Sequence, residues 1–314
     1  MHDPEKGGGY LRNGGREFTV VQNVFFLLWQ EHLIYTEMPA NRTIPMSPQP
    51  LLDGNRTISI AQRDEFRDNG HLLVRGLLDL EEIAVYRGVI LEAVKKQGRE
   101  KRKLPERGIY GRMFGQLVNL WRVDEGARQF VLSRRLARVA ADLLGVSGVR
   151  IYHDHALFKE AGGRETYWHQ DQYYWPLDTA DTVTMAMPLV DLSIEMGMFV
   201  FASGSHKYGT LWDPKLSSEP DGLYRRYIRE HHFPLTCAAG MRAGDATWHY
   251  GNTVHHTLGN VSDRRREIMT ITYMADGARV TQPLHKAQVS ELNMWLMGLP
   301  PGRLAASELN PLIV

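Results

Sequence analysis

The sequence predicts a mainly β domain, built as a barrel or a double-sheet jelly roll and preceded by helices. Three observations predict this fold class. Helical periodicity is concentrated between residues 58 and 145. After Gly148 the chain changes to short runs in which apolar and polar residues alternate, as in strands. Glycine-containing turns divide these runs, and we read no helix between them, which favours a barrel or jelly roll over parallel α/β folds.

The helical part begins near residue 58 with two helical stretches around a short strand, "HLLVRGLL", at residues 71–78. Residues 80–96 carry apolar side chains at helical spacing, and Gly98 follows as a stop. Residues 124–145 predict one further amphipathic helix with Gly145 as its C-cap.

The strand part begins with "VRIYHDHALFKE" at 149–160, which alternates clearly. "TVTMAMPLVDL" at 182–192 and "GMFVFASGSH" at 197–206 predict two further strands. Residues 231–256 predict several short strands divided by glycines, and "REIMTITYMAD" at 266–276 predicts another. The predicted domain therefore spans 58–285.

Two segments flank this domain. Residues 1–57 are expected to be a partly disordered extension, and translation could start at Met38 or Met46 because nothing earlier resembles a packed element. Residues 286–314 are expected to form an irregular tail packed on the domain. Its Met294, Trp295 and Leu296 could cap the fold or meet a partner subunit, so the oligomeric state stays open.

Composition excludes several classes of partner. The net charge is +1, which gives no electrostatic reason to expect nucleic acid or a membrane surface. The most apolar stretch, residues 18–29, is too short to span a bilayer. The single cysteine, Cys237, permits neither an internal disulfide nor a thiolate zinc site, and we expect a cytoplasmic protein.

A possible metal site lies in "YWHQDQYYWPLD", residues 167–178. His169 and Asp171 stand two apart, so on a strand their side chains would point to the same face. Because a histidine two residues from an acid is common by chance, the pattern alone could equally be a crowded core strand. A third ligand could come from residues 244–273, where His255 and His256 adjoin.

Several blocks together resemble the phytanoyl-CoA dioxygenase family of iron- and 2-oxoglutarate-dependent oxygenases. They are "EFRDNGHLLVRGLL", "LFKEAGGRETYWHQDQYYWPLD", "MPLVDLSIEMGMFVFASGSH" and "GD" followed by "TVHHTLGNVSDRRRE", in the family's order. The resemblance covers about residues 66–276. It implies a double-stranded β-helix, which is a cupin-like jelly roll with flanking helices. It also implies Fe(II) as cofactor with 2-oxoglutarate and O2 as co-substrates.

The resemblance implies a facial triad of two histidines and one carboxylate on Fe(II), which leaves open positions for the co-substrates. The first two ligands are then His169 and Asp171. The family places the distal histidine seven residues before the serine of its "N-x-S-D" motif, which is Ser262 here. This spacing selects His255, and we expect His256 to face the other way.

The family also places an arginine eleven residues after the distal histidine, to bind the 2-oxoglutarate carboxylate. That position is Arg266, and a guanidinium suits a carboxylate because it can donate two parallel hydrogen bonds. Arg264 and Arg265 are close alternatives in a run that is more typical of a solvated turn.

Other co-substrate contacts implied by the resemblance are Thr257 and His155, with Gln116 as a weaker candidate. The segment 153–155, His-Asp-His, is a second possible metal site because its two histidines share a strand face. No third ligand for it has a comparable family match.

The predicted substrate pocket includes Tyr173 and Trp175, which would share the face of Asp171 if the strand continued past it. Relatives often carry tryptophan where this chain has Ala186, so we expect a wider cavity there, open to substrate or filled by the tail. Lys159 is a weaker pocket candidate.

These residues imply a dioxygenase that oxidises, most simply hydroxylates, a small molecule and releases succinate and CO2. Related halogenases lack the carboxylate ligand, so the presence of Asp171 favours oxidation. The alternative is a jelly-roll binding protein that has lost activity, since fold alone does not fix function. A zinc or nickel cupin is disfavoured because it would lack a further histidine and leave Arg266 without a purpose.

Overall fold

The computed structural model describes residues 52, 54, 56–97, 115–213 and 220–314. The predicted extension at 1–57, with its alternative start sites, falls almost entirely outside these residues, as does Gly98. Among the described residues, no helix is long and apolar enough to cross a membrane.

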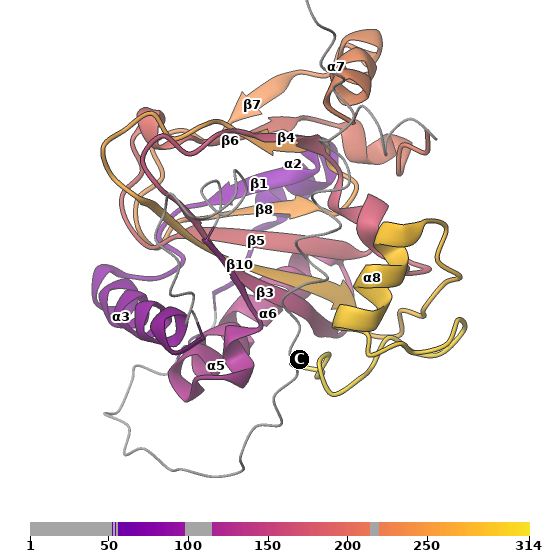
Figure 1. Ribbon diagram of the computed structural model, residues 1–314, viewed down its shortest axis with the longest axis horizontal. Coiled ribbons are helices and arrows are strands. Elements are labelled where there is room, and N and C mark those ends of the chain that lie inside the picture. Colours follow the sequence, from indigo (N-terminus) through magenta and orange to yellow (C-terminus); the bar gives the residue numbers. More distant parts are fainter. Residues whose placement is uncertain (1–51, 53, 55, 98–114, 214–219) are drawn as a thin grey trace, which may run out of the picture. The chain divides into compact units, whose positions relative to one another are not determined.

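Helices and strands follow one another along the chain as labelled in Figure 1. The helices are α2 (Ile60–Asn69), α3 (Leu80–Gln97), α5 (Glu125–Val131), α6 (Arg134–Leu144), α7 (Pro220–His231) and α8 (Lys286–Trp295), with short 3-10 turns η2 (Leu120–Arg122), η3 (Asp171–Tyr174), η4 (Ile194–Met196) and η5 (Ser205–Tyr208). The strands are β1 (His71–Val74), β2 (Gly115–Val118), β3 (Val149–Lys159), β4 (Thr166–His169), β5 (Thr182–Pro188), β6 (Phe199–Ala202), β7 (Leu235–Cys237), β8 (Ala246–Tyr250), β9 (His255–Thr257) and β10 (Arg266–Ala275).

Local sequence explains where the helices begin and end. Ser59 and Gln62 form a reciprocal capping box at the start of α2, and Gly70 closes that helix in the left-handed conformation. Ser133 caps α6, which ends at Gly145 with a φ of 73°. The C-cap predicted at Gly145 is therefore confirmed.

Three predictions about helices were wrong. The single helix predicted over 124–145 is broken at Leu132 and Ser133 into α5 and α6. Asp124 caps α5 and Ser133 caps α6, so each half has its own start signal. The strand region also contains a helix, α7, and the C-terminal segment begins with α8 rather than with irregular structure.

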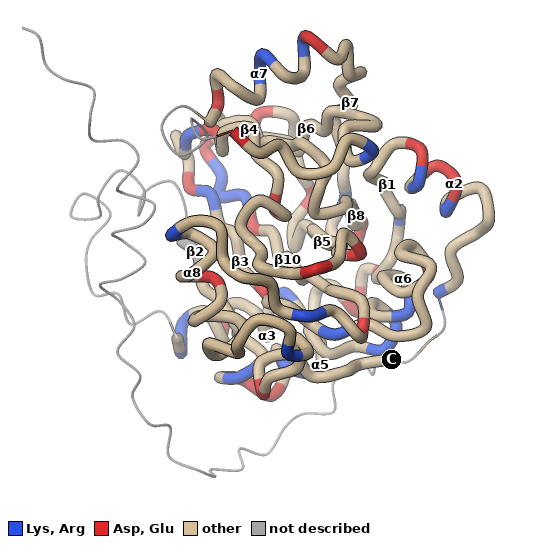
Figure 2. Tube along the Cα trace, turned by 90° about the vertical axis from the view of Figure 1, so that its right-hand side faces the viewer, with Lys and Arg blue, Asp and Glu red and all other residues tan. Residues whose placement is uncertain are grey.

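The strands form two antiparallel sheets, as expected for a jelly roll. The larger has the order β1-β8-β5-β10-β3-β2 and the smaller the order β4-β9-β6-β7. Figures 1 and 2 place β4 and β6 on one side of the larger sheet, with α7 beyond them, and α3, α5 and α6 on the opposite side. The larger sheet thus has one face toward the helices and one toward the smaller sheet.

Strand alternation sorts the side chains between these two faces. On β10, Met269 and Ile271 pack in the main core with the helices. Their neighbours Ile268, Thr270 and Thr272 point toward the smaller sheet, and Ile268 packs there with Phe199 and Phe201 of β6. The inner face of β10 therefore carries the polar side chains Thr270 and Thr272 between the two sheets.

The register of β3, β10 and β5 lines up these inner residues. Arg266 lies opposite Lys159, and Thr270 lies opposite both His155 and Ala186. A bulge at Tyr152 shifts the register between Thr272 and Tyr273. One end of the inner face is therefore marked by Arg266 and Lys159, and the other by the bulge.

The C-terminal segment is anchored to β3. The amide of Val149 donates to the carbonyl of Val314, and the amide of Ile313 donates back to Val149. Fully buried Asn310 donates from Nδ2 to the carbonyl oxygens of Ile151 and Tyr152, at 3.2 and 3.4 Å. This segment supplies hydrogen bonds that the bulged strand would otherwise lack.

We expect Asn310→Ala to lower the free energy of unfolding by about 2–3 kcal/mol, because it leaves buried carbonyl groups without donors. Denaturant unfolding followed by circular dichroism measures the loss. Glu308→Ala, which removes an exposed side chain two residues away, serves as control and should change little. Equal losses in the two variants would contradict the anchoring role.

Candidate metal centre

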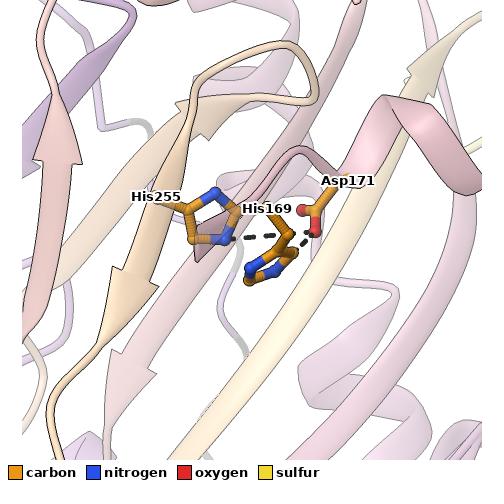
Figure 3. A group of neighbouring side chains, drawn as sticks. All are labelled: His169, Asp171 and His255. Carbon is orange, nitrogen blue, oxygen red and sulfur yellow. Dashed lines mark ion pairs between the residues drawn. The ribbon is translucent and has the colours of Figure 1, made fainter. Parts of the chain in front are cut away.

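Two strands of the smaller sheet bring His169, Asp171 and His255 together (Figure 3). His169 ends β4 and pairs directly with His255, which begins β9. Gln170 keeps an extended backbone, so Asp171 projects to the same side as His169 before the chain enters η3. One potential ligand atom from each of the three residues lies within 4.8 Å of the others. Among the described residues, this is the only such group of three or more histidine, cysteine or acidic side chains.

The two carboxylate oxygens of Asp171 have different environments. Oδ1 lies 3.5 Å from Nε2 of His169 and 4.0 Å from Nε2 of His255. Oδ2 accepts a hydrogen bond from the Thr184 hydroxyl at 3.1 Å and a longer one from Nε2 of His249 at 3.4 Å. The side chain is therefore oriented with Oδ1 toward the two histidines.

Both triad imidazoles present Nε2 as the free acceptor. Nδ1 of His169 lies 2.8 Å from the carbonyl oxygen of Tyr167, and Nδ1 of His255 lies 3.0 Å from that of Thr253. Because a carbonyl oxygen only accepts, the proton of each neutral ring belongs on Nδ1. The Nε2 lone pairs then point at the same space as Oδ1, as a metal ligand set requires.

The local electrostatics favour an ionised Asp171 beside a neutral His255. Burial alone would raise the pKa of Asp171, but the adjacent imidazoles of His169, His249 and His255 outweigh it and hold this pKa well below its usual range. Burial alone would lower the pKa of His169, but the Asp171 carboxylate outweighs it and raises that pKa. Burial lowers the pKa of His255 well below its usual value, and the neighbouring histidines add to this effect. These protonation states are the ones in which both groups can bind a metal.

A guanidinium without an acidic partner lies at the far end of the inner face. Arg266 is 1% exposed and donates one hydrogen bond, from Nη1 to the carbonyl of Gly197 at 2.8 Å, while its Nε has no partner. No carboxylate among the described residues forms an ion pair with it. Burial lowers its pKa to about 10, so it stays charged at neutral pH. A buried unpaired cation of this kind suits an anionic ligand.

Lys159 lies beside Arg266 rather than in the predicted substrate pocket. Its Nζ donates to the Thr257 hydroxyl at 3.0 Å and to the carbonyl of Leu258 at 2.9 Å. Burial, and then the charge of Arg266, lower the pKa of Lys159 to about 6. Lys159, Thr257 and Arg266 therefore form a cluster, here called the basic end, that a carboxylate would stabilise.

The two alternative arginines differ sharply from Arg266. Arg265 pairs with Glu267 at 2.6 Å, and the exposed Arg264 donates from Nη2 to the sulfur of Met196 at 3.7 Å. Of these three arginines, only Arg266 has a buried side chain, because it is the first residue of β10 and points to the inner face.

His256 faces away from the triad, as expected, and its ring packs on Trp168 at 4.1 Å between centroids. In the alternative site at 153–155, His153 and His155 stack at 4.2 Å, but Asp154 points to the other face and accepts from the Leu120 amide. The three side chains of that segment therefore do not converge.

The predicted pocket residues fall in different places. Asp171 to Tyr174 form the 3-10 turn η3, so the strand does not continue and Tyr173 does not share a face with Trp175. Trp175 is buried against Tyr152, whereas Tyr173 stacks on His285 at 4.4 Å between centroids. The expectation of simple alternation was wrong because the backbone winds up directly after the second triad residue.

Ala186 is fully buried in the cluster that contains Phe199, Phe201 and Ile268. Side chains of this cluster occupy the space that the missing tryptophan was expected to leave open. Gln116 lies on β2 opposite Leu157, but its side chain is outside the described part of the chain.

Five side chains near the triad and helix α8 are partly exposed, and we call the region that they border the recess. They are His155, His169, Asp171, Tyr174 and Glu291. Helix α8, which carries Glu291, packs against η3, which carries Asp171 and Tyr174.

Sequence reasoning missed His249, Thr184 and Glu291. His249 on β8 and Thr184 on β5 lie directly opposite each other, and both contact Oδ2 of Asp171. Only the strand pairing shows this relation, since 65 positions separate them. Glu291 comes from the segment predicted to be irregular, and no local pattern marks it.

Comparisons with known proteins agree with this geometry. A profile of the family described as phytanoyl-CoA dioxygenase matches residues 66–268. The ectoine dioxygenase of Stutzerimonas stutzeri (strain A1501) is 22% identical over 244 residues, covering 70% of this chain and 78% of that protein. A probable α-ketoglutarate-dependent hypophosphite dioxygenase of Stutzerimonas stutzeri is 24% identical over 233 residues, covering 69% and 79%.

Solved structures extend the likeness over most of the chain. The non-haem α-ketoglutarate-dependent carbocyclase SnoK has a TM-score of 0.67 at 24% identity, covering 83% of this chain and 100% of that one. The epimerase SnoN, in complex with Fe3+, α-ketoglutarate and nogalamycin RO, has a TM-score of 0.65 at 26% identity, covering 81% and 98%. The predicted jelly roll is confirmed by these structural neighbours.

We expect Thr184→Val to weaken Fe(II) binding about tenfold, because it removes a hydrogen bond that orients Asp171. Anaerobic metal titration followed by calorimetry measures the affinity. The matched control is Thr182→Val on the same strand, whose hydroxyl bonds Gln172 instead. An unchanged affinity in Thr184→Val would show that its hydroxyl does not orient the ligand.

Proposed function

This chain belongs to the phytanoyl-CoA dioxygenase family, and we propose that it hydroxylates a C–H bond of a small organic molecule. In this reaction one oxygen atom of O2 enters the product, and the other enters succinate as 2-oxoglutarate loses CO2. The family match and the named relatives make the chain a 2-oxoglutarate-dependent non-haem iron dioxygenase. The substrate and the choice of hydroxylation are the proposed part.

One observation carries the proposal: the triad on the smaller sheet and Arg266, a buried cation without an acidic partner among the described residues, on the inner face of the larger sheet each offer groups that suit a ligand. The triad offers one carboxylate oxygen and two Nε2 atoms, which suit Fe(II). The orphaned Nε of buried Arg266 suits a carboxylate. We propose His169, Asp171 and His255 as the metal ligands, and Arg266 as the residue that binds 2-oxoglutarate.

The bound iron would supply the activation of O2 that drives the oxidation. The side chains of the protein would orient the metal ligands and the co-substrate. Thr184 and His249 hold Oδ2 of Asp171, so that Oδ1 is left for the metal. Arg266 and Lys159 would orient the distal carboxylate of 2-oxoglutarate, with Thr257 bridging to Lys159. His155 lines the recess between the two ends and is proposed as a further co-substrate contact.

The alternative of an inactive binding protein is less well supported. A protein that had lost the chemistry would have no need to keep all four of His169, Asp171, His255 and Arg266. It would have still less need to keep buried polar side chains that orient them, since each buried polar group costs stability when unmatched. Asp171 also fills the place that a halide would need, which argues against halogenation.

The relatives do not fix the substrate. One is named an ectoine dioxygenase and another a probable hypophosphite dioxygenase. Ectoine and hypophosphite are chemically very different compounds. The recess next to the triad is bordered by Tyr174, and the buried Trp175 follows it in the chain. Walls of this kind favour an organic molecule with an apolar or ring-bearing part. We therefore propose a small organic substrate, with Tyr173 at the rim rather than at the centre.

Anaerobic addition of Fe(II) and then 2-oxoglutarate to metal-free protein should produce the weak visible metal-to-ligand charge-transfer band of this enzyme class. His255→Ala should abolish the band because it removes one of three metal ligands. Arg266→Ala should require far more 2-oxoglutarate to produce the band, because the variant lacks the buried guanidinium that would bind the co-substrate carboxylate.

Adjacent residues provide matched controls for both variants. His256→Gln and Arg264→Ala change the neighbouring histidine and arginine, which face away from the triad or into solvent. Both should keep the band at wild-type co-substrate concentrations. Folded wild-type protein that binds Fe(II) but gives no band with 2-oxoglutarate would refute the proposed activity.

Lys159→Gln should raise the dissociation constant of 2-oxoglutarate about ten- to hundredfold, since a hydrogen bond to a charged group typically contributes about 1.5–3 kcal/mol. The charge-transfer band titrated with 2-oxoglutarate measures this constant. Lys207→Gln, at the exposed ion pair with Asp68, is the control. If Lys159→Gln binds as wild type does, the basic end consists of Arg266 alone.

A further inference from the structure

A pocket of about 400 Å³ lies on the outer side of the basic end. Helix α3, the turn η4 and the start of β10 contribute to its wall, together with single residues that follow β3 and β5. Glu267 lines it and follows Arg266 on β10, so strand alternation turns the two side chains to opposite faces. None of the proposed metal ligands or co-substrate contacts lines this pocket. Its volume is within the range of sites that bind small organic ligands.

A buried carboxylate holds two guanidinium groups of this pocket side by side. Glu267 is 3% exposed and accepts from Nε of Arg87 at 2.7 Å and from Nη2 of Arg265 at 2.6 Å. Burial alone would raise the pKa of Glu267, but the two guanidiniums outweigh it and hold that pKa below its usual value. The guanidinium of Arg265 also lies over the ring of Phe158, 4.9 Å from its centroid. Both arginines are thereby fixed, while 41% of the side chain of Arg87 and 38% of that of Arg265 stay exposed.

The guanidinium groups of the pocket outnumber its carboxylates by three to two. The third is Arg264, which is exposed and donates from Nη2 to the sulfur of Met196 at 3.7 Å. It forms no ion pair with an acidic side chain in the part of the chain that the structure describes. The second carboxylate, Glu160, lies 4.0 Å from Nη1 of Arg265. An excess of fixed N–H donors of this kind suits a ligand with several anionic oxygens.

The remaining wall of the pocket is apolar. It consists of Val190 and of Met196, which is 1% exposed. A ligand that complements the whole wall therefore has an apolar body as well as an anionic head. Because a phosphate monoester ends in three oxygens and a carboxylate in two, the phosphate offers more acceptors to three guanidinium groups.

We propose that this pocket binds the phosphate monoester of a small organic molecule. The phosphate is held by the guanidiniums of Arg87, Arg264 and Arg265. The organic group packs against Val190 and Met196. The site is separate from the metal centre and from the basic end, so its ligand binds while 2-oxoglutarate is bound.

Binding of simple probes tests this site without turnover. Protein loaded anaerobically with Fe(II) and saturating 2-oxoglutarate is titrated by calorimetry with phenyl phosphate, methyl phosphate and phenol. The ionic strength is kept low, because salt screens exposed charges. Wild-type protein should bind phenyl phosphate at least about tenfold more tightly than either other probe, since only phenyl phosphate offers both an apolar body and an anionic head.

Two variants should change this affinity in opposite directions. Arg264→Gln should weaken the binding of phenyl phosphate about tenfold, as expected for the loss of one charge-assisted hydrogen bond. Glu160→Gln should tighten it about threefold, because a carboxylate that repels the phosphate is removed from a solvated site. A purely structural role of these side chains would not give opposite signs.

Arg226→Gln, which changes an exposed arginine on α7 in an ion pair with Glu230, is the control and should bind phenyl phosphate as wild type does. Thermal unfolding checks that each variant is folded. The charge-transfer band should be normal in all of them, since none of these residues lies at the triad or the basic end.

Three results would overturn the proposal. They are equal binding of phenyl phosphate and either other probe by wild type, wild-type affinity in Arg264→Gln, and weaker binding in Glu160→Gln. In each case a normal charge-transfer band would leave the proposed oxygenase function standing. If the band fails while phenyl phosphate binding still depends on Arg264, the phosphate site stands and the oxygenase proposal falls.

Discussion

The direct pairing of His169 on β4 with His255 on β9 is the contact on which the site depends. It fixes the distance between two imidazoles that lie 86 positions apart in the sequence. Asp171 can join them because Gln170 remains extended for one residue before η3 begins. Any shift in this register would turn one histidine to the opposite face, where His256 packs on Trp168. The small sheet is thus the part of the fold that selects the ligands.

The large sheet gathers basic groups at one end of its inner face. Lys159 and Arg266 lie opposite each other across β3 and β10, and burial lowers the pKa of both side chains. A carboxylate bound between them would stabilise their charged forms. The placement of two basic groups together in the interior is therefore better explained by binding of an anion than by stability.

Local sequence signals were sufficient for strands such as β3, β5 and β10, for the C-cap at Gly145 and for the His-x-Asp pair, because these depend on neighbours a few residues apart. The choices of His255 over His256 and of Arg266 over Arg265 came from family spacing. The structure places His255 beside His169 and Asp171, and buries Arg266 at the start of β10. Thr184 and His249 could not be predicted, because their relation exists only once β5 pairs with β8. The break at Ser133 escaped prediction because a continuous apolar stripe hid its N-cap signal.

The C-terminal segment contacts strand β3 in two ways, one that affects stability and one that affects the surroundings of the triad. Asn310 holds the carbonyls of Ile151 and Tyr152, where β3 bulges and sets Tyr152 beside His153. The same segment begins with α8, whose Trp295 packs against His153 and His155. Neither α8 nor Asn310 supplies a metal ligand. Changes in this segment could therefore alter which molecule fits the recess while the triad and the basic end remain intact, because these are built from other strands.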